Sequence, residues 1–284
     1  MFTFFLFPEM RLLFFSFLLA LLLSIAACEP MPNGGIPFYL QCDSVTLQTD
    51  YFTQGDNSQG ISDIWVESGS KNFGAYELPA QFPVLDEGEV SFVLSAGVKQ
   101  SGQSGIRVVY PFYQTDTFTI TATSGNVYKH TPTFRYKDAA KFTFSPEDFE
   151  ASNGFNNMSI VSDTNVRYGT SCGAITVTLT DSATTASQLA LYDLPEGQEI
   201  WLEVDYKSEV PFWVGYFGKF GGTVLRNPVL FVNAKPTWTK LYLKLSETIG
   251  SLKADQYNLY FEALRPLGTN GGRIYIDNVK LVTF

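Results

Sequence analysis

The chain has 284 residues, of which 45% are hydrophobic and 17% are charged, and its formal net charge is −9 at pH 7. This apolar content excludes an intrinsically disordered chain, and an acidic balance without a basic run excludes nucleic-acid binding and attraction to anionic lipid. Aromatic residues reach 15% and recur with Val, Ile and Thr in short runs, which favours β-strands.

The N-terminal segment has the pattern of an export signal. "RLLFFSFLLALLLSIAAC" carries one charge, Arg11, and then an apolar run shorter than the ~20 residues needed to span a bilayer. Met10 directly precedes Arg11, so either Met1 or Met10 starts the chain. The run ends in "IAAC", residues 25–28, which resembles the bacterial lipobox. The resemblance implies cleavage after residue 27 and lipidation of Cys28, and the alternatives are an ordinary signal peptide or a signal anchor.

A lipidated Cys28 would hold the protein at a membrane without a transmembrane helix, because several acyl chains together give stable anchoring. Glu29 follows the cysteine, so an inner-membrane retention aspartate is missing. We therefore expect a signal peptide over 1–27 and a lipid-anchored protein of the outer membrane, on either its periplasmic or its cell-surface face. Residues 28–35 are rich in proline and glycine and predict a short tether.

Beyond the tether, strand-like runs alternate with Gly-, Asp- and Ser-rich turn signals about every ten residues, which is typical of β-sandwiches. Residues 36–136 predict a small β-sandwich and residues 140–284 a β-jelly roll, so the expected fold class is all-β. Only "SETIGSLKAD" is expected to hold a short helix. The brief connection "KDAAK" predicts that the two domains are closely coupled.

One stretch of the first domain, "IWVESGSKNFGAYELPAQFPVLDEGEVSFVLSAGVK", resembles a PEGA-type module. In that family a strand, a turn, a glycine, a proline-bearing crossover and an "E-G" turn lead to a strand that ends at a glycine. Those places are occupied here by Gly74, Pro79, Pro83, Gly88 and Gly97. The family's Asp-Gly turn and Thr-Pro pair are missing. The resemblance implies a small PEGA-like or Ig-like β-sandwich that carries no chemistry of its own.

The ends of the second domain carry another resemblance. "EDFE" near its start and "IYIDNVKLV" at its end resemble the first and last strands of galactose-binding-like jelly rolls, which include many carbohydrate-binding modules. The two-domain order after a lipobox resembles lipoproteins of Bacteroidota. In the jelly-roll family an acidic residue on each terminal strand can hold a calcium ion, and Glu150 and Asp277 match those positions. The resemblance implies a structural calcium completed by backbone carbonyls near Asn153 or Gly154, and two solvated carboxylates are the alternative.

Catalytic patterns are missing from the sequence. His130 is the single histidine, and it alternates with Lys129 and Thr131 in a strand. No serine-nucleophile, zinc-protease, P-loop or paired CxxC motif occurs. Glu203 and Asp205 share one strand face, as a carboxylate pair would, but the same spacing describes any solvated face of a sandwich. We therefore expect that the protein is not an enzyme.

The two cysteines beyond the lipobox lie in different domains. Cys42 and Cys172 both stand in strand-like surroundings, where cysteine is usually a small buried apolar residue. A disulfide that bridges the two domains is the alternative, because an exported chain permits one.

The best indication of a ligand is a tryptophan on an otherwise polar strand face. In "EIWLEVDYK" Trp201 shares its phase with Glu203 and Asp205, and the opposite phase is apolar. In "VPFWVGYFGK" both phases are apolar, and Trp213 lies on the second one. One surface is therefore covered by another body, which is the first domain, a protein partner or a sugar.

These observations predict a non-catalytic outer-membrane lipoprotein that acts as a binding or scaffolding subunit of an outer-membrane protein complex. The alternative is a surface glycan-binding lipoprotein of a polysaccharide-capture system, in which Trp201, Glu203, Asp205 and Trp213 contact the sugar. The surroundings of Trp201 distinguish the two hypotheses. An open cleft at this residue favours glycan binding, whereas burial under the first domain favours the scaffold.

Overall fold

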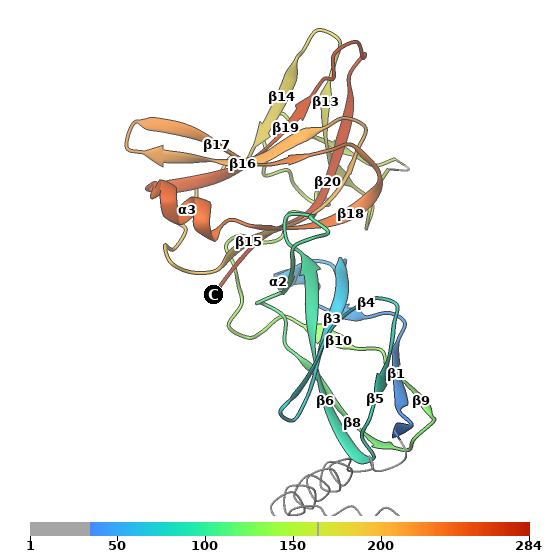
Figure 1. Cartoon of the computed structure of the whole chain (residues 1–284). Helices are drawn as coiled ribbons and strands as arrows, with labels where there is room; N and C mark the ends of the chain where they lie inside the picture. The colour runs from blue at the N-terminus through green and yellow to red at the C-terminus, as the bar shows by residue number, and fades with distance from the viewer. Residues whose placement is uncertain (1–34, 164) are drawn as a thin grey trace, which may run out of the picture.

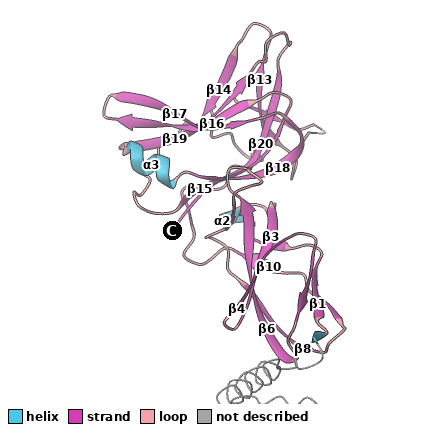
Figure 2. Cartoon of the chain, viewed as in Figure 1, coloured by secondary structure: helices cyan, strands magenta, loops and turns pink. Residues whose placement is uncertain are grey.

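The computed structural model describes residues 35–163 and 165–284. Cys28, the predicted signal peptide and nearly all of the predicted tether lie outside the described residues. In the part of the chain that is described, no helix is both long and apolar enough to cross a membrane. Strands and their connections make up almost all of this part (Figure 2), so the predicted all-β fold class is confirmed.

Residues 36–136, which we call the N-terminal unit, form three small sheets. The largest has the order β4-β3-β6-β7, with β8 paired to the other half of the long strand β6, and the others are β5-β1-β9 and β10-β2. The elements are β1 (Phe38–Cys42), β2 (Thr46–Gln48), α2 (Tyr51–Gln54), β3 (Ile61–Ser68), β4 (Lys71–Glu77), β5 (Ala80–Val84), β6 (Gly88–Lys99), β7 (Arg107–Val109), β8 (Asp116–Ala122), β9 (Val127–Lys129) and β10 (Thr133–Arg135).

Alternating burial explains how these short strands form a core. Along β1 and β5 every second residue is buried, so each strand presents one apolar face to the interior. The largest fully buried side chains of this unit include Phe38, Phe82, Phe92, Phe112 and Phe134. Helix α2 was not expected from the sequence. It is a single turn that the side chain of Asp50 caps by accepting a hydrogen bond from the N–H of Phe52 at 3.0 Å.

Residues 140–284, which we call the C-terminal unit, form a sandwich of two antiparallel sheets with the orders β12-β13-β20-β15-β18 and β14-β19-β16-β17. The first and last strands are neighbours, since β11 pairs with β20. The elements are β11 (Lys141–Phe142), β12 (Ser159–Val161), β13 (Cys172–Val177), β14 (Ala183–Ser187), β15 (Ile200–Ser208), β16 (Phe212–Phe220), β17 (Thr223–Val232), β18 (Lys235–Lys244), α3 (Ser246–Leu252), β19 (Gln256–Leu264) and β20 (Gly272–Thr283).

The sandwich is closed by an apolar core between its sheets. Leu202 and Val204 of β15 face Val214 and Phe261 of the other sheet within one buried cluster. The short helix α3 falls inside "SETIGSLKAD", where the sequence predicts it, and buries Ile249. This architecture agrees with the predicted jelly roll.

The two units are in direct contact (Figure 1). The end of the N-terminal unit that carries α2, the start of β3 and the β6–β7 connection lies against strands β15 and β18 of the C-terminal unit. The N–H of Ser101, in the β6–β7 connection, donates to the carbonyl oxygen of Tyr242 at 2.7 Å. Trp201, Tyr242 and Val282 belong to the apolar cluster of the N-terminal unit. The close coupling expected from the short connection is therefore present.

Candidate functional site

The predicted ligand-binding face of β15 lies inside the contact between the units. Trp201 is 2% exposed, and Glu203 and Asp205 are fully buried. The ring of Tyr110, from the N-terminal unit, meets the ring of Trp201 edge to face with centroids 5.3 Å apart. The prediction that these three residues contact a ligand is therefore wrong for this arrangement. Strand alternation placed them on one face, but the other unit covers that face.

Glu203 is held by hydroxyl groups from the N-terminal unit. The hydroxyl of Tyr110 donates to Oε1 at 2.7 Å, and that of Tyr136 lies 2.9 Å from both carboxylate oxygens. Burial, and next the charge of Glu203, raise the pKa of both tyrosines well above the usual value, so both hydroxyls keep their protons. Lys240 Nζ lies 3.7 Å from Glu203 Oε2. The carboxylate is thus satisfied without solvent, which is the condition for burying a charge.

Asp205 is the centre of a second set of polar contacts across the boundary. Ser58 Oγ donates to Asp205 Oδ2, Lys240 Nζ lies 3.4 Å from the same oxygen, and Asn278 Nδ2 lies 3.3 Å from it. Asn278 Nδ2 also donates to Asp56 Oδ2 at 2.9 Å, which connects β20 to the N-terminal unit. Strands β15, β18 and β20, which carry Asp205, Lys240 and Asn278, therefore bind the N-terminal unit through charged hydrogen bonds as well as through aromatic packing.

Asp277 stands directly opposite Asp205 in the register of β15 and β20. Burial is the largest effect that raises the pKa of Asp277, and the charges of Asp205 and Asp56 add to it. The hydrogen bond from the N–H of Asn278 lowers the pKa in part, and the net value is about 8. Oδ2 of Asp277 is buried and has no hydrogen-bond partner among the described residues. Two like charges opposite each other in a dry sheet are unfavourable, so Asp277 holds a proton through much of the neutral range.

Glu150 and Asp277, the predicted calcium ligands, are satisfied separately. Glu150 is exposed, and its carboxylate accepts hydrogen bonds from the N–H and Oγ1 of Thr170 and from the N–H of Ser171. Partial desolvation raises the pKa of this carboxyl, but the three hydrogen bonds outweigh it, so that the pKa lies below its ordinary value. Asp277 Oδ1 accepts from the N–H of Asn278 at 2.8 Å. Among the described residues, no group of three or more acidic, histidine or cysteine side chains is arranged to hold a metal. The two carboxylates thus accept hydrogen bonds from different donors, and the shared calcium ion stays a prediction.

Trp213, the fourth predicted ligand-binding residue, is separate from the other three. It is half-buried on the outer side of β16, directly opposite Phe231 in the register of β16 and β17. The two rings meet edge to face with centroids 5.2 Å apart, and Phe231 is 43% exposed. Trp213 therefore supports an aromatic side chain that reaches solvent.

Phe231 leads into a groove at the boundary between the units. Two cavities of about 380 Å³ and about 360 Å³ adjoin there and share Gly102, Tyr206, Lys235 and Leu241. The first lies between the β6–β7 and β17–β18 connections and adds polar side chains and Phe231. The second lies between the start of β3 and strand β18 and adds Trp238. The groove thus combines aromatic rings, amides, hydroxyls and ammonium groups from both units.

The β6–β7 connection forms one wall of this groove and is held in place by its backbone. Ser101 and Gly102 have φ values of 55° and 67°, in a left-handed region of the backbone that residues other than glycine rarely adopt. The hydrogen bond from Ser101 to Tyr242 holds the turn against β18. On the opposite side, Trp238 Nε1 donates to the carbonyl oxygen of Asn165 at 2.9 Å, which orients its ring.

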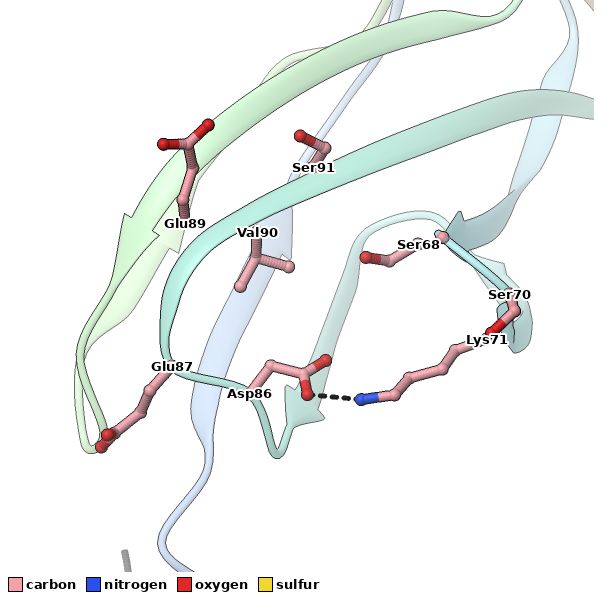
Figure 3. A pocket seen from close by; sticks show the side chains of 9 residues that line it. Ser68, Ser70, Lys71, Asp86, Glu87, Glu89, Val90 and Ser91 are labelled. Carbon is pink, nitrogen blue, oxygen red and sulfur yellow. Dashed lines mark hydrogen bonds and ion pairs between the residues drawn. The ribbon is translucent and has the colours of Figure 1, made fainter. Parts of the chain in front are cut away.

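A third cavity, of about 470 Å³ (Figure 3), lies beside the start of β6, at the end of the N-terminal unit that points away from the C-terminal unit (Figure 1). Strand β3 runs from the groove at Ile61 to this cavity at Ser68. Apart from Val90 and a glycine its lining is polar, and Lys71 and Asp86 form an ion pair across it. No aromatic side chain lines it, so it lacks the flat apolar surface that a sugar ring would contact.

The two cysteines beyond the lipobox and the histidine noted in the sequence are held by neighbouring residues away from the groove. Cys42 and Cys172 are both buried and free, so the disulfide considered from the sequence is absent between them. Burial raises the pKa of the two thiols to about 11 and about 12, which makes them poor nucleophiles. His130 Nε2 lies 2.6 Å from Asp116 Oδ2, and its ring stacks on Phe118. None of the three residues lines the groove.

Comparison with known proteins gives similarity of fold only. No family model matches the chain, and no curated protein matches it. The xylan-binding CBM22-1 domain of Paenibacillus barcinonensis Xyn10C is 12% identical with a TM-score of 0.37, over 52% of this chain and 97% of that one. The family 11 carbohydrate-binding module of Clostridium thermocellum Lic26A-Cel5E is 17% identical with a TM-score of 0.34, over 48% and 91%. The enzymatically active domain of tailspike protein 4 from bacteriophage CBA120 is 13% identical with a TM-score of 0.39, over 58% and 26%.

These solved structures include β-sandwich carbohydrate-binding modules. At such low identities and TM-scores the likeness says nothing about the function of this chain.

Proposed function

We propose that this protein is a non-catalytic glycan-binding protein, and that the groove between its two units is the binding site. The observation that carries the proposal is the groove itself, in which the exposed ring of Phe231 and the partly buried rings of Trp238 and Tyr206 occur together with polar side chains. Aromatic rings offer flat apolar faces for sugar rings, and a few placed polar groups fix orientation. A sugar bound there would contact both units.

The stacking surface is tested by Phe231→Ala. Phe231 is half exposed and outside the core, so its loss should leave the fold intact. We expect affinity for oligosaccharides found on a glycan array to fall at least tenfold, or about 1.4 kcal/mol, as measured by isothermal titration calorimetry. Leu225→Ala is the matched control, because Leu225 is 46% exposed on the same strand and lines neither cavity. Equal affinities for both variants and the native chain would remove Phe231 from the site.

A binding or scaffolding subunit of an outer-membrane protein complex is the second candidate. It is favoured by strand β17, which is the edge of its sheet and exposes Val224, Leu225 and Phe231. An exposed apolar edge strand can pair with another chain. Burial of Trp201 under the N-terminal unit also agrees with this candidate. Loss of a stoichiometric outer-membrane partner in the Leu225→Ala variant, with glycan binding absent from the native chain, would favour it over glycan binding.

We further propose that Cys28 is lipidated and that the protein belongs to the outer membrane. The sequence "IAAC" after a short apolar run supports this address, and Cys28 lies outside the described residues. A lipid at this position would join the N-terminal unit to the membrane through the tether.

A further inference from the structure

The charges that line the groove are of one sign. Lys99, Lys235 and Lys240 contribute to its walls, whereas no aspartate or glutamate lines either cavity. The chain as a whole has a formal net charge of −9. The lining of the groove thus lacks a carboxylate that would repel an anion directly.

The three lysines differ in whether a nearby carboxylate already neutralises the charge of the ammonium group. Lys240 has a buried side chain and is bound by Glu203 and Asp205. Lys99 Nζ lies 4.0 Å from Glu77 Oε1, where both side chains are partly exposed, so that pair is weak. Lys235 is exposed, lines both cavities, and has no carboxylate within ion-pair distance among the described residues. Its ammonium group is thus available to a ligand.

Tyr206 supplies a second unused polar group at the same place. The residue is only 8% exposed, yet it lines both cavities. No hydrogen bond joins its hydroxyl to another described residue, and burial alone raises its pKa. The hydroxyl therefore stays protonated and can donate to an oxygen of a ligand in the groove.

Neutral polar groups surround these two residues. Ser101, Gln103 and Asn233 line the first cavity, and Ser62, Ser104 and Thr239 line the second. Such hydroxyls and amides can donate to and accept from sugar hydroxyls. The groove thus offers an anion site beside positions suited to an uncharged sugar.

We propose that the groove selects acidic glycans, whose carboxylate or sulfate group is bound by Lys235 with a hydrogen bond from Tyr206. This inference rests on the proposed glycan-binding function and names its ligand class. Lys99, on the N-terminal unit, lies at the opposite wall of the second cavity and binds a further acidic group along the same chain. Two cations on different units would then recognise the repeating charge of an acidic polysaccharide.

The test uses the mature chain and two panels of oligosaccharides. The acidic panel contains oligogalacturonates, oligoalginates and sulfated galactan fragments, and the neutral panel contains methyl-esterified oligogalacturonates, xylo-, cello- and galacto-oligosaccharides. We expect the tightest ligands to be acidic and to weaken between about 0.05 M and about 0.5 M NaCl, because salt screens exposed charges. Carboxylate and sulfate ligands in the acidic panel distinguish the two anionic groups.

The variant Lys235→Gln should reduce the affinity for acidic ligands at least tenfold. Lys253→Gln is its control, since Lys253 is 66% exposed and lines neither cavity, and it should change affinity less than twofold. Equal, salt-independent binding of neutral ligands, or an unchanged affinity of Lys235→Gln, would overturn the inference while leaving glycan binding in place. Failure of every ligand in both panels would overturn the inference and the proposed function together.

Discussion

Lys240 is the residue on which the contact between the units most depends. Its side chain is 1% exposed, and its ammonium group lies between Glu203, Asp205 and the hydroxyl of Ser58. Burial lowers the pKa of Lys240, but the charges of Asp205 and Glu203 outweigh it and raise the pKa above the ordinary value. Lys240 is therefore charged, and it neutralises carboxylates that water cannot reach.

Removing this charge should be costly. In Lys240→Met the two carboxylates lose their shared cation, and we expect the free energy of unfolding to fall by about 3–5 kcal/mol. Urea denaturation followed by tryptophan fluorescence measures the change. Lys244→Met is the control on the same strand, because its ion pair with Glu199, at 3.1 Å, is partly exposed and should cost no more than about 1 kcal/mol. Similar losses in both variants would show that the buried cluster is not stabilised through Lys240.

At the scale of single elements, strand β6 shows why one residue type is required. Gly97 faces Asp63 of β3 in the register of the sheet. A Cβ at this position would lie 1.9 Å from Asp63 Oδ1 and 2.9 Å from Trp65 Nε1. These two atoms form a hydrogen bond of 2.9 Å with each other. Gly97 thus makes room for a buried carboxylate.

Gly97→Ala should break this arrangement, because Asp63 would have to move and lose its bond to Trp65. We expect a loss of about 3 kcal/mol in the free energy of unfolding, from overpacking and from a charged hydrogen bond. Gly105→Ala serves as the comparison in the same unit, since nothing lies within 4 Å of a Cβ built there. Urea denaturation curves that coincide for the two variants would contradict this account of β6.

At the scale of the whole molecule, the two units form one joined body with a lysine-lined groove at their boundary in an otherwise acidic chain. The predicted lipid anchor precedes the N-terminal unit, so the groove would lie beyond that unit from the membrane. A ligand in the aqueous space on the protein's side of the membrane would then reach the groove without crossing the bilayer.

Loss of the lipid should release this whole body. In Cys28→Ala no acyl chains can attach, so we expect the lipid label to be lost and the protein to leave the outer-membrane fraction. Incorporation of a radiolabelled fatty acid followed by fractionation of cells measures both effects. Persistence of label and of membrane association in the variant would exclude Cys28 as the anchor.

The sequence by itself determined the fold class and the longer helix of this protein. Strand-rich runs and turn residues predict an all-β chain, and "SETIGSLKAD" predicts its helix α3, because these depend on neighbours in sequence. Alternation along β15 correctly placed Trp201, Glu203 and Asp205 on one face, since all three contact the N-terminal unit, whereas Leu202 and Val204 lie in the core of the sandwich. Four-residue helix α2, whose single turn depends on the cap at Asp50, was not expected.

Only the tertiary structure decided what covers each face. Trp201 and Glu203 are buried because Tyr110 and Tyr136, distant in sequence, pack against them, and periodicity contains no information about such contacts. The groove has the same origin. Gln103 lies in the β6–β7 connection of the N-terminal unit, whereas Lys235 is the first residue of β18 in the C-terminal unit. A site that forms where two units meet depends on how they dock, and docking is set by the complementarity of whole surfaces.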